Sequence, residues 1–351
     1  MIQIDQFVIG EDSPVFIIAE LSANHNQNKQ IAIDTIRAAK KTGANAIKLQ
    51  TYTPDTLTID CDNEHFRINE GTLWDGKTLY ELYGEAYTPW EWHEELFRVA
   101  KEEELICFSS PFDFTSVDFL EKFHVPAYKI ASFEIQDIPL IDYVARKGKP
   151  VIMSTGIATE QDIQLAVDTC RNAGNEQIIL LKCTSSYPAP VELANMKTMV
   201  DMAHRFHTPV GLSDHTMGNT VPVVAASLGA RIIEKHFILD KSIGGPDAEF
   251  SLDVAEFTAM VQAVREAEKA LGKVSYELSA KVEKNRKFAR SLFVVTDMKA
   301  GDLFTADNIR SIRPGYGLHP KYYSQIIGKQ ATMDIRRGTP LASSHIPTNL
   351  N

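Results

Sequence analysis

The sequence lacks a long hydrophobic run and an amino-terminal targeting pattern. It contains no uninterrupted apolar stretch of about 18 residues, the length that a membrane-spanning helix needs. The amino-terminal MIQIDQFVIG has no basic region followed by a long apolar stretch, as a secretion signal would have. We therefore expect neither a membrane span nor secretion.

Basic charge and cysteine are also scarce. The 36 Lys and Arg residues are outnumbered by 46 Asp and Glu residues, and the net charge of −10 argues against nucleic-acid and membrane partners. A local basic pocket for a small anion is still compatible with this charge. The four cysteines have no C-x-x-C spacing, which argues against a disulfide framework or a zinc knuckle and favours reduced thiols in the cytoplasm.

Short apolar runs alternate regularly with amphipathic stretches. The runs lie at residues 15–19, 46–49, 105–108, 127–130, 151–153, 178–181, 210–212 and 232–233. Amphipathic helices are expected between them, most clearly at 29–41, 90–103, 160–173 and 255–271. Eight strand–helix repeats in roughly 260 residues predict an α/β fold, a (β/α)8 TIM barrel. A doubly wound open sheet is the alternative.

The pattern predicts a large domain followed by a small one. The barrel domain is expected over residues 1–275, with an amino-terminal hairpin in the first 14 residues. A linker is expected at 276–290, and residues 291–351, with β-like runs at 292–295 and 308–312, are expected to form a small β-rich domain. The connection from residue 51 to about residue 89 is long for a compact domain, which favours a functional role.

Polar side chains follow every expected strand, where active sites of such barrels lie. They are Glu20, Lys48 and Gln50, Ser109 and Ser110, Lys129, Ser132 and Glu134, Ser154 and Thr155, Lys182, Thr184 and Ser185, Ser213 and His215, and Lys235 and His236. Any one of them could be an ordinary strand end. Polar groups after all eight strands instead predict an active site.

Two histidines follow neighbouring strands, in Ser213-Asp214-His215 and Glu234-Lys235-His236. Two neutral imidazoles at one rim can bind a divalent metal and leave positions open for substrate. The alternative is a pair of structural histidines.

Lysines and hydroxyl groups at the same rim indicate an anion site. Lys48, Lys129, Ser132, Ser154 and Ser213 could converge on a phosphate and a carboxylate through charge-assisted hydrogen bonds. The alternative for Lys48 is a structural ion pair with Glu20.

Glu20 and Glu134 form a candidate acid–base pair, because carboxyl groups in a partly dry site can be tuned for proton transfer. The alternative is that both only orient the lysines. Gly156 would allow the backbone to approach a ligand closely.

The expected strand ends carry the motifs AELSANHN, AIKLQT, CFSSPF, YKIASFE, MSTGIAT, KCTSSYP, GLSDHT and EKHF. Together these motifs resemble those of the sialic acid synthase family, which condenses phosphoenolpyruvate with an amino sugar to give a nine-carbon 2-keto acid. FARSLFVVTDMKAGDLFTADNIRSIRPGYGLHP and IRRGTPL resemble the antifreeze-like (SAF) domain of these enzymes. The insert LWDGKTLYELYGEAYTPWEWH, with Phe133 in KIASFE, is most similar to the pseudaminic acid branch.

The resemblance implies roles for particular side chains. Those expected to hold phosphoenolpyruvate are Lys48, Ser110, Lys129, Ser132, Ser154 and Ser213. His215 and His236 would bind Mn²⁺, Mg²⁺ or Co²⁺ and act in catalysis with Glu20 and Glu134. The sugar would contact Glu20, Tyr187, Asp247, Phe288 and Arg313, the last two from the partner subunit of a domain-swapped homodimer.

Other activities are alternatives. An N-acetylneuraminate or legionaminate synthase would share the fold and the chemistry. A Schiff-base aldolase would use Lys129 or Lys182 as nucleophile and need no metal. A non-catalytic sugar- or ice-binding protein would fit the small domain but would not require the polar rim.

Overall fold

A computed structural model describes residues 1–69, 71 and 74–347. The chain forms two compact units, Met1–Gly272 and Lys273–Asn351. The division falls slightly before the expected boundary at residue 275, so the expected linker lies within the second unit. None of the helices in the described part of the chain is both long and apolar enough to cross a membrane.

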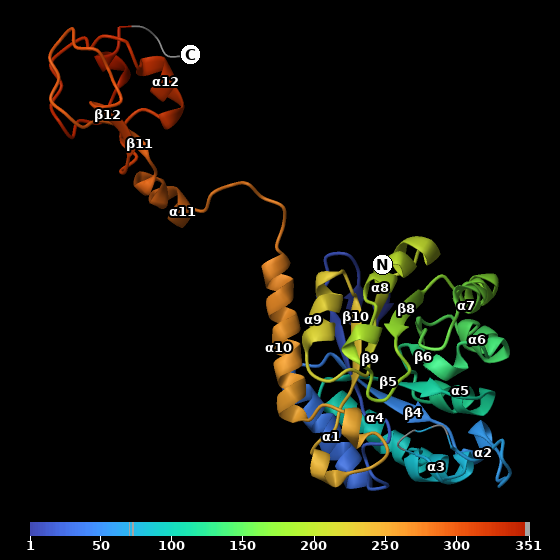
Figure 1. Ribbon diagram of the computed structural model, residues 1–351. Coiled ribbons are helices and arrows are strands. Elements are labelled where there is room, and N and C mark those ends of the chain that lie inside the picture. The colour runs from blue at the N-terminus through green and yellow to red at the C-terminus, as the bar shows by residue number, and fades with distance from the viewer. Residues whose placement is uncertain (70, 72–73, 348–351) are drawn as a thin grey trace. The chain divides into compact units, whose positions relative to one another are not determined.

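The first unit is a closed barrel of parallel strands (Figure 1). The strands are β3 (Phe16–Glu20), β4 (Ala46–Thr51), β5 (Ile106–Pro111), β6 (Tyr128–Ile130), β7 (Val151–Ser154), β8 (Ile178–Cys183), β9 (Val210–Asp214) and β10 (Ile232–His236). Each pairs with its neighbour in sequence, and β10 pairs with β3 to close the barrel. The predicted TIM barrel is therefore confirmed, and the open doubly wound sheet is wrong.

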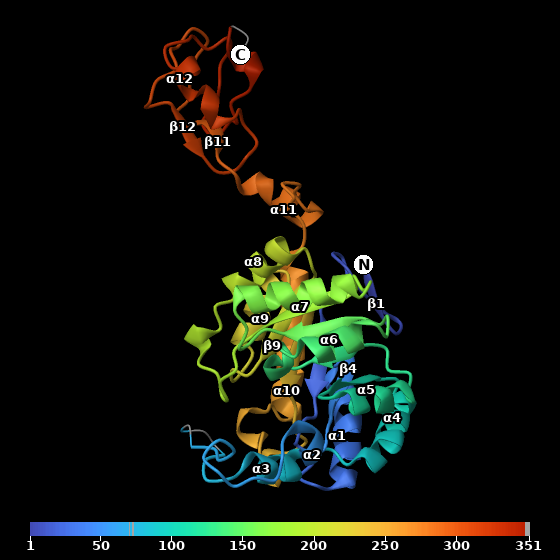
Figure 2. The same cartoon turned by 90° about the vertical axis from the view of Figure 1, so that its right-hand side faces the viewer.

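Helices lie outside the strands (Figure 2). Those of the barrel unit are α1 (Lys29–Thr42), α2 (Pro54–Leu57), α3 (Leu79–Ala86), α4 (His93–Glu102), α5 (Phe114–Glu121), α6 (Ile138–Ala145), α7 (Glu160–Asn172), α8 (Lys197–Phe206), α9 (Thr220–Ser227) and α10 (Val254–Leu271). Local sequence sets the ends of α1. Asn28 accepts from the first-turn amides, and Gly43, at φ 88°, adopts the left-handed conformation that ends the helix.

Nearly every strand residue is buried, since one face of each strand packs inside the barrel and the other packs against helices. Gly211 shows how tight the interior is, because a Cβ there would lie 2.3 Å from the Ile232 carbonyl oxygen. The predicted amino-terminal hairpin is formed by β1 (Ile2–Ile4) and β2 (Phe7–Ile9). It packs Phe7 on Phe16 at the start of β3, with ring centres 4.8 Å apart.

The long connection after β4 carries its own secondary structure, the helices α2 and α3. Thr78 caps α3 by accepting from the Glu81 amide, while the Glu81 carboxylate accepts from the Thr78 amide. This reciprocal cap fixes the start of α3. We refer to residues 52–89 as the β4–α4 insert.

The second unit is small and β-rich. Its strands β11 (Ser291–Val294) and β12 (Ile309–Ile312) are antiparallel, and its helices are α11 (Ala280–Asn285) and α12 (Tyr323–Ile326). Both predicted β-runs are confirmed. Leu292, Phe304 and Ile326, all fully buried, belong to a separate hydrophobic core.

Candidate active site

Charged side chains from four strands meet inside the carboxyl-terminal end of the barrel. Glu20, Lys48 and His236 lie in register on neighbouring strands, so they project to the same side of the sheet. Lys48 Nζ lies 3.0 Å from Glu20 Oε2 and 3.2 Å from Glu234 Oε2. Lys129 Nζ lies 3.4 Å from Glu234 Oε1. Two ammonium groups and two carboxyl groups thus form one buried network, which we call the charge cluster.

Glu234 was not among the predicted site residues. It sits two positions before His236 on β10, and side chains two apart on a strand face the same way, so this alternation could have revealed it. It joins the two lysines and also accepts a hydrogen bond from Ser213 Oγ at 3.1 Å. Its position makes it the centre of the charge cluster.

The two carboxyl groups of the charge cluster have opposite pKa shifts. Burial raises the pKa of Glu20 to about 7, against the lowering effect of Lys48. Burial alone would also raise the pKa of Glu234, but Lys129 and Lys48 together hold it at about 2. Glu234 is therefore a fixed negative charge near neutral pH, whereas Glu20 can gain or lose a proton there.

The lysines differ as well. Glu20 and Glu234 raise the pKa of Lys48 although its burial opposes this. Burial lowers the pKa of Lys129, which Glu234 only partly offsets. The expected Glu20–Lys48 ion pair exists, but it is one part of a network that also reaches Glu234 and Lys129.

Serine hydroxyls surround the lysines. Lys129 Nζ donates to Ser154 Oγ at 2.7 Å, and Ser132 Oγ lies 2.8 Å from Ser185 Oγ. Ser110 Oγ is fully buried and has no hydrogen-bond partner among the described residues. Burying a hydroxyl without a hydrogen-bond partner costs folding free energy, so Ser110 is well suited to donate to a bound anion.

Gly156 keeps space open beside these serines. A Cβ at this position would lie 2.1 Å from Ser185 Oγ and 2.6 Å from Ser132 Oγ. The close approach expected from the sequence is thus a packing requirement against two serine side chains.

Glu134 lies just after β6, in a short 3₁₀ turn over Ser132–Glu134. Burial raises the pKa of its carboxyl group to about 7, against the opposing effect of Lys129. Its Oε2 atom is buried and has no hydrogen-bond partner among the described residues. Glu20 and Glu134 can therefore both exchange protons near neutral pH, as the predicted acid–base pair requires.

The two histidines lie side by side, with ring centres 5.3 Å apart. His215 Nδ1 donates to the Thr184 carbonyl oxygen at 3.0 Å, which leaves Nε2 with its lone pair when the ring is neutral. Burial holds the pKa of His236 well below its usual range, so its ring is neutral. His236 Nδ1 is buried and lacks a hydrogen-bond partner among the described residues.

The histidine pair offers nitrogen donors, but no described side chain completes a larger metal-binding set. Within residues 1–69, 71 and 74–347 no group of three or more His, Cys, Asp and Glu side chains is placed to hold a metal ion. A metal held by His215 and His236 would therefore keep open positions for substrate or water.

Tyr187 and Asp247 lie against the histidines. The Tyr187 ring centre is 4.4 Å from that of His215, and Asp247 Oδ2 is 3.7 Å from His236 Nδ1. Asp247 also accepts from Ser22 Oγ and, at 3.3 Å, from the Ala23 amide. All three predicted sugar contacts of the barrel unit thus lie beside a predicted metal ligand, since Glu20 is in register with His236.

Some strand-end residues expected at the rim point away from it. Lys235 is buried in an ion pair with Asp214 and donates to the Thr216 carbonyl oxygen, and Ser109 bonds to Thr51 at 2.7 Å. Both occupy the outer face of the barrel because they alternate with inward-facing neighbours. Placing them at the active-site rim was wrong.

Lys182 is a further correction. Its Nζ donates to the Cys183 carbonyl oxygen at 2.6 Å, whereas the Cys183 thiol lies on the inner face, 3.9 Å from His215 Nδ1. Strand alternation therefore directs Lys182 outward. This geometry does not support Lys182 as a Schiff-base nucleophile.

Phe288 and Arg313 belong to the second unit. Phe288 ends a short 3₁₀ turn and is 55% exposed, and Arg313 is also exposed. Their contribution to a partner's barrel stays a prediction.

The barrel can therefore bind a small anion and move protons beside two imidazoles, of which that of His236 is neutral. Lys48, Lys129 and the serine hydroxyls supply donors in a buried setting, where charge-assisted hydrogen bonds are strong. Glu20 and Glu134 supply proton exchange. These features match an enzyme that acts on an anionic substrate.

Comparisons with known proteins agree with this arrangement. Residues 35–276 match the NeuB family and residues 289–347 match the SAF domain. The chain is 52% identical to the pseudaminic acid synthase of Campylobacter jejuni, over 94% of this chain and 96% of the relative. It is 36% identical to the N,N'-diacetyllegionaminic acid synthase of Legionella pneumophila, over 96% of each chain. The solved spore coat polysaccharide biosynthesis protein SpsE of Bacillus subtilis is 33% identical over 99% of both chains, with a TM-score of 0.67.

Proposed function

The chain belongs to the NeuB family and carries a SAF domain, and from this premise we propose that it is a pseudaminic acid synthase. It condenses phosphoenolpyruvate with 2,4-diacetamido-2,4,6-trideoxy-L-altrose and water, and releases pseudaminic acid and phosphate. The higher identity to the pseudaminic acid synthase than to the legionaminic acid synthase supports this sugar over the alternatives.

The charge cluster carries the proposal. Lys48 and Lys129 share the carboxylate of Glu234, and Lys48 also pairs with Glu20. Because the pKa of Glu20 is about 7, this carboxyl group is partly protonated near neutral pH, and the two ammonium groups are not fully neutralised. An anion that enters beside them gains two cations and the hydroxyls of Ser110, Ser132, Ser154 and Ser213. This set fits the carboxylate and phosphate of phosphoenolpyruvate.

His215 and His236 would hold a divalent ion, Mn²⁺, Mg²⁺ or Co²⁺. The neutral state of His236, and its buried Nδ1 without a hydrogen-bond partner among the described residues, support this assignment. Lewis-acid polarisation of the sugar aldehyde is the chemistry that an ion held there supplies.

The protein side chains then position the reactants and move protons. C3 of phosphoenolpyruvate bonds to the aldehyde carbon of the open-chain sugar, and water adds at C2. The C–O bond to phosphate breaks, phosphate leaves, and the keto acid closes to its ring. Glu134 or Glu20, each with a pKa of about 7, protonates the alkoxide or accepts a proton from the water.

A domain-swapped homodimer in the cytoplasm completes the proposal. Phe288 and Arg313 of one subunit would contact the sugar in the barrel of the other. Their exposure leaves both side chains accessible to a partner. Size-exclusion chromatography with light scattering tests the dimer, and a monomer at working concentration would contradict it.

Phosphate release with Mn²⁺ tests the proposed function. The enzyme is offered phosphoenolpyruvate with the L-altrose sugar, its legionaminate-route counterpart, or N-acetylmannosamine. Turnover with the first alone, abolished by chelator, supports the proposal. Turnover with another sugar instead would show that the proposed substrate is wrong. If no sugar leads to phosphate release, the proposed synthase activity is contradicted.

Two further measurements separate the mechanism from its rivals. With ¹⁸O at the bridging oxygen of phosphoenolpyruvate, C–O cleavage sends the label to phosphate, and label retained in the keto acid would contradict it. A Schiff-base aldolase would instead be inactivated by borohydride in the presence of pyruvate, without any metal.

A further inference from the structure

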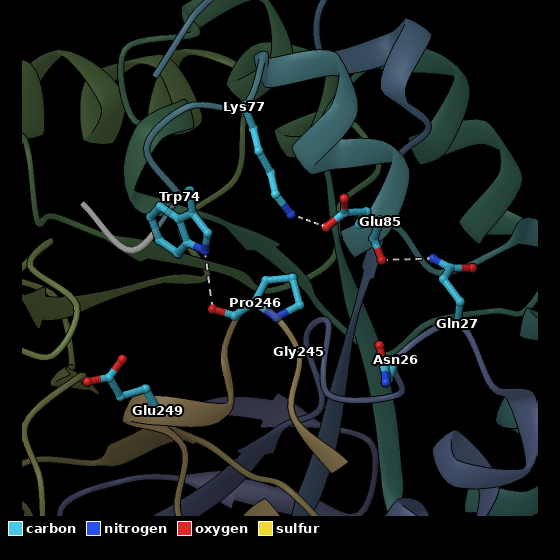
Figure 3. Close-up of a pocket in the computed structure, with 8 residues that line it drawn as sticks. All are labelled: Asn26, Gln27, Trp74, Lys77, Glu85, Gly245, Pro246 and Glu249. Atoms are coloured by element: carbon cyan, nitrogen blue, oxygen red, sulfur yellow. Dashed lines mark hydrogen bonds and ion pairs between the residues drawn. The ribbon is translucent and has the colours of Figure 1, made fainter. Parts of the chain in front are cut away.

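A cavity of about 460 Å³ lies near the mouth of the barrel, outside the charge cluster (Figure 3). Three segments line it, namely the loop after β3, the β4–α4 insert and the loop after β10. The lining residues are Asn26, Gln27, Trp74, Lys77, Glu85, Gly245, Pro246 and Glu249.

The loop after β10 depends on glycine to form its side of the cavity. Gly244 and Gly245 have φ values of +68° and +114°, a backbone conformation that residues other than glycine rarely adopt. The next residue, Pro246, accepts a hydrogen bond through its carbonyl oxygen from Trp74 Nε1 at 3.2 Å. This bond ties the insert to the loop and holds the indole ring in the cavity wall (Figure 3).

The cavity shares a wall with the active site. The Trp74 ring centre is 5.9 Å from that of Tyr187, which in turn is 4.4 Å from that of His215. On the other side, Pro246 directly precedes Asp247, which faces His236. A ligand that reacts beside the histidines can therefore extend past Tyr187 to Trp74.

The two acetamido groups of the proposed sugar differ in how far they extend from its reacting carbon. Its C1 aldehyde reacts beside the histidines, and the methyl carbon of its C4 acetamido group is roughly 7 Å away along an extended chain of single bonds. The C2 acetamido group is attached next to the reacting carbon and stays inside the barrel. The C4 acetamido group extends farther from the reacting carbon and is therefore the better match to the outer cavity.

The chemistry of the lining suits a neutral amide with a methyl group. Lys77 and Glu85 neutralise each other in an ion pair, while Glu249 adds an exposed carboxylate, so the cavity does not favour an anion. Asn26 Nδ2 donates to the Ile243 carbonyl oxygen at 3.3 Å, which leaves its Oδ1 to accept an amide N–H. The Trp74 and Pro246 rings offer apolar surface for a methyl group.

We propose that this outer cavity is the subsite for the C4 acetamido group, with Trp74 as a specificity-determining residue. The inference rests on the proposed function and deepens it, because it explains how a 2,4-diacetamido sugar is selected over a hexosamine. Trp74 contacts the acetyl methyl group, and Asn26 or Glu249 accepts the amide N–H.

A double-mutant cycle between enzyme and substrate tests the contact. The wild type and Trp74→Ala are each assayed with the L-altrose sugar and with an analogue in which the C4 acetamido group is replaced by formamido. Loss of one methyl group from a fitted apolar pocket is expected to lower wild-type kcat/KM by about 10-fold. In Trp74→Ala the same change is expected to cost less than about threefold, because the methyl group has no ring to contact.

Two controls isolate the contact. The 2-formamido analogue should be affected equally in the wild type and Trp74→Ala, because the C2 group lies inside the barrel. Tyr80→Ala changes an aromatic residue of the same insert that bonds to Asp55 at 3.2 Å and does not line the cavity. It should retain the wild-type discrimination at C4.

The outcomes distinguish the two proposals. If the wild type turns over but loss of the C4 methyl group lowers kcat/KM equally in the wild type and in Trp74→Ala, the subsite is overturned. The synthase assignment is then unaffected. Coupling of Trp74 to the C2 group instead also overturns it. No wild-type turnover with any sugar contradicts the proposed function itself.

Discussion

Replacing Glu134 with glutamine should make the stability of the barrel less dependent on pH. The pKa of this carboxyl group rises from its ordinary value of 4.5 to about 7, chiefly because burial disfavours the charged form. Glutamine has nearly the same shape but cannot ionise. Glu134→Gln therefore removes the cost of burying a carboxylate and leaves the packing unchanged.

The sign and size of the effect follow from proton linkage. Between pH 4.5 and 7 the folded state binds the proton and the unfolded state has lost it, so stability falls as pH rises. At about 1.36 kcal/mol for each pH unit, the wild type loses roughly 2.5 kcal/mol between pH 5 and pH 8 at this site. Residual solvent access to Glu134 reduces this to nearer 2 kcal/mol. Glu134→Gln does not lose this stability, because glutamine does not ionise.

Tryptophan fluorescence is a suitable probe, because all three tryptophans, Trp74, Trp90 and Trp92, belong to the barrel unit. A stabilisation of about 2 kcal/mol in a unit of this size corresponds to roughly 3–4 °C in Tm. The Tm advantage of Glu134→Gln over the wild type should therefore grow by that amount from pH 5 to pH 8.

The control is Glu94→Gln, which alters an exposed glutamate on α4. It should shift stability by less than about 0.5 kcal/mol at both pH values, as surface substitutions usually do. A Glu134→Gln advantage that is the same at both pH values, or larger at pH 5, would refute the assignment of a raised pKa to Glu134.

Three further predictions follow from the site and the barrel. Lys129→Met should raise the KM for phosphoenolpyruvate by about 100-fold in steady-state assays, because a buried charge-assisted contact is lost. The KM for the sugar should change by less than about threefold, and equal effects on both substrates would contradict the anion site. His236→Ala should weaken Mn²⁺ binding at least about 100-fold by calorimetry, and unchanged affinity would exclude it as a ligand. Gly211→Ala should destabilise the barrel by more than about 2 kcal/mol in urea, because its Cβ would meet the Ile232 carbonyl oxygen at 2.3 Å. In Gly84→Ala, where the nearest atom is 3.9 Å away within α3, stability should be unchanged or slightly higher, and similar losses in both variants would contradict the steric explanation.

Much of the fold and part of the site were predictable because their signals are local. The eight apolar runs became the eight strands, since a strand buried on both faces is apolar along its length. His215, His236, Lys48 and Lys129 were predictable as rim residues because each lies at or near the end of such a run. Their positions in one chamber then follow from barrel closure.

The errors came from treating all polar residues at a strand end alike. Lys235 was predicted at the rim and Glu234 was not, although strand alternation puts Glu234 on the same face as His236 and Lys235 on the opposite one. The alternation was present in the sequence, but its phase was not fixed until one inward residue was known. Trp74 lies in the insert whose sequence resembles the pseudaminic acid branch, but its place in a cavity wall depends on contacts with Pro246 and Tyr187, far away in the chain.

The sequence by itself determined the order and number of strands, the two-part organisation and the residue types available at the rim. These depend on hydrophobic periodicity and on short motifs, which act over neighbouring residues. The tertiary structure decided how those residues function. Glu20 and Glu234 have the same side chain, yet burial raises the pKa of one to about 7 while two nearby lysines hold the other at about 2. Electrostatic energy depends on distance through space and on access to water, and only the folded barrel sets both.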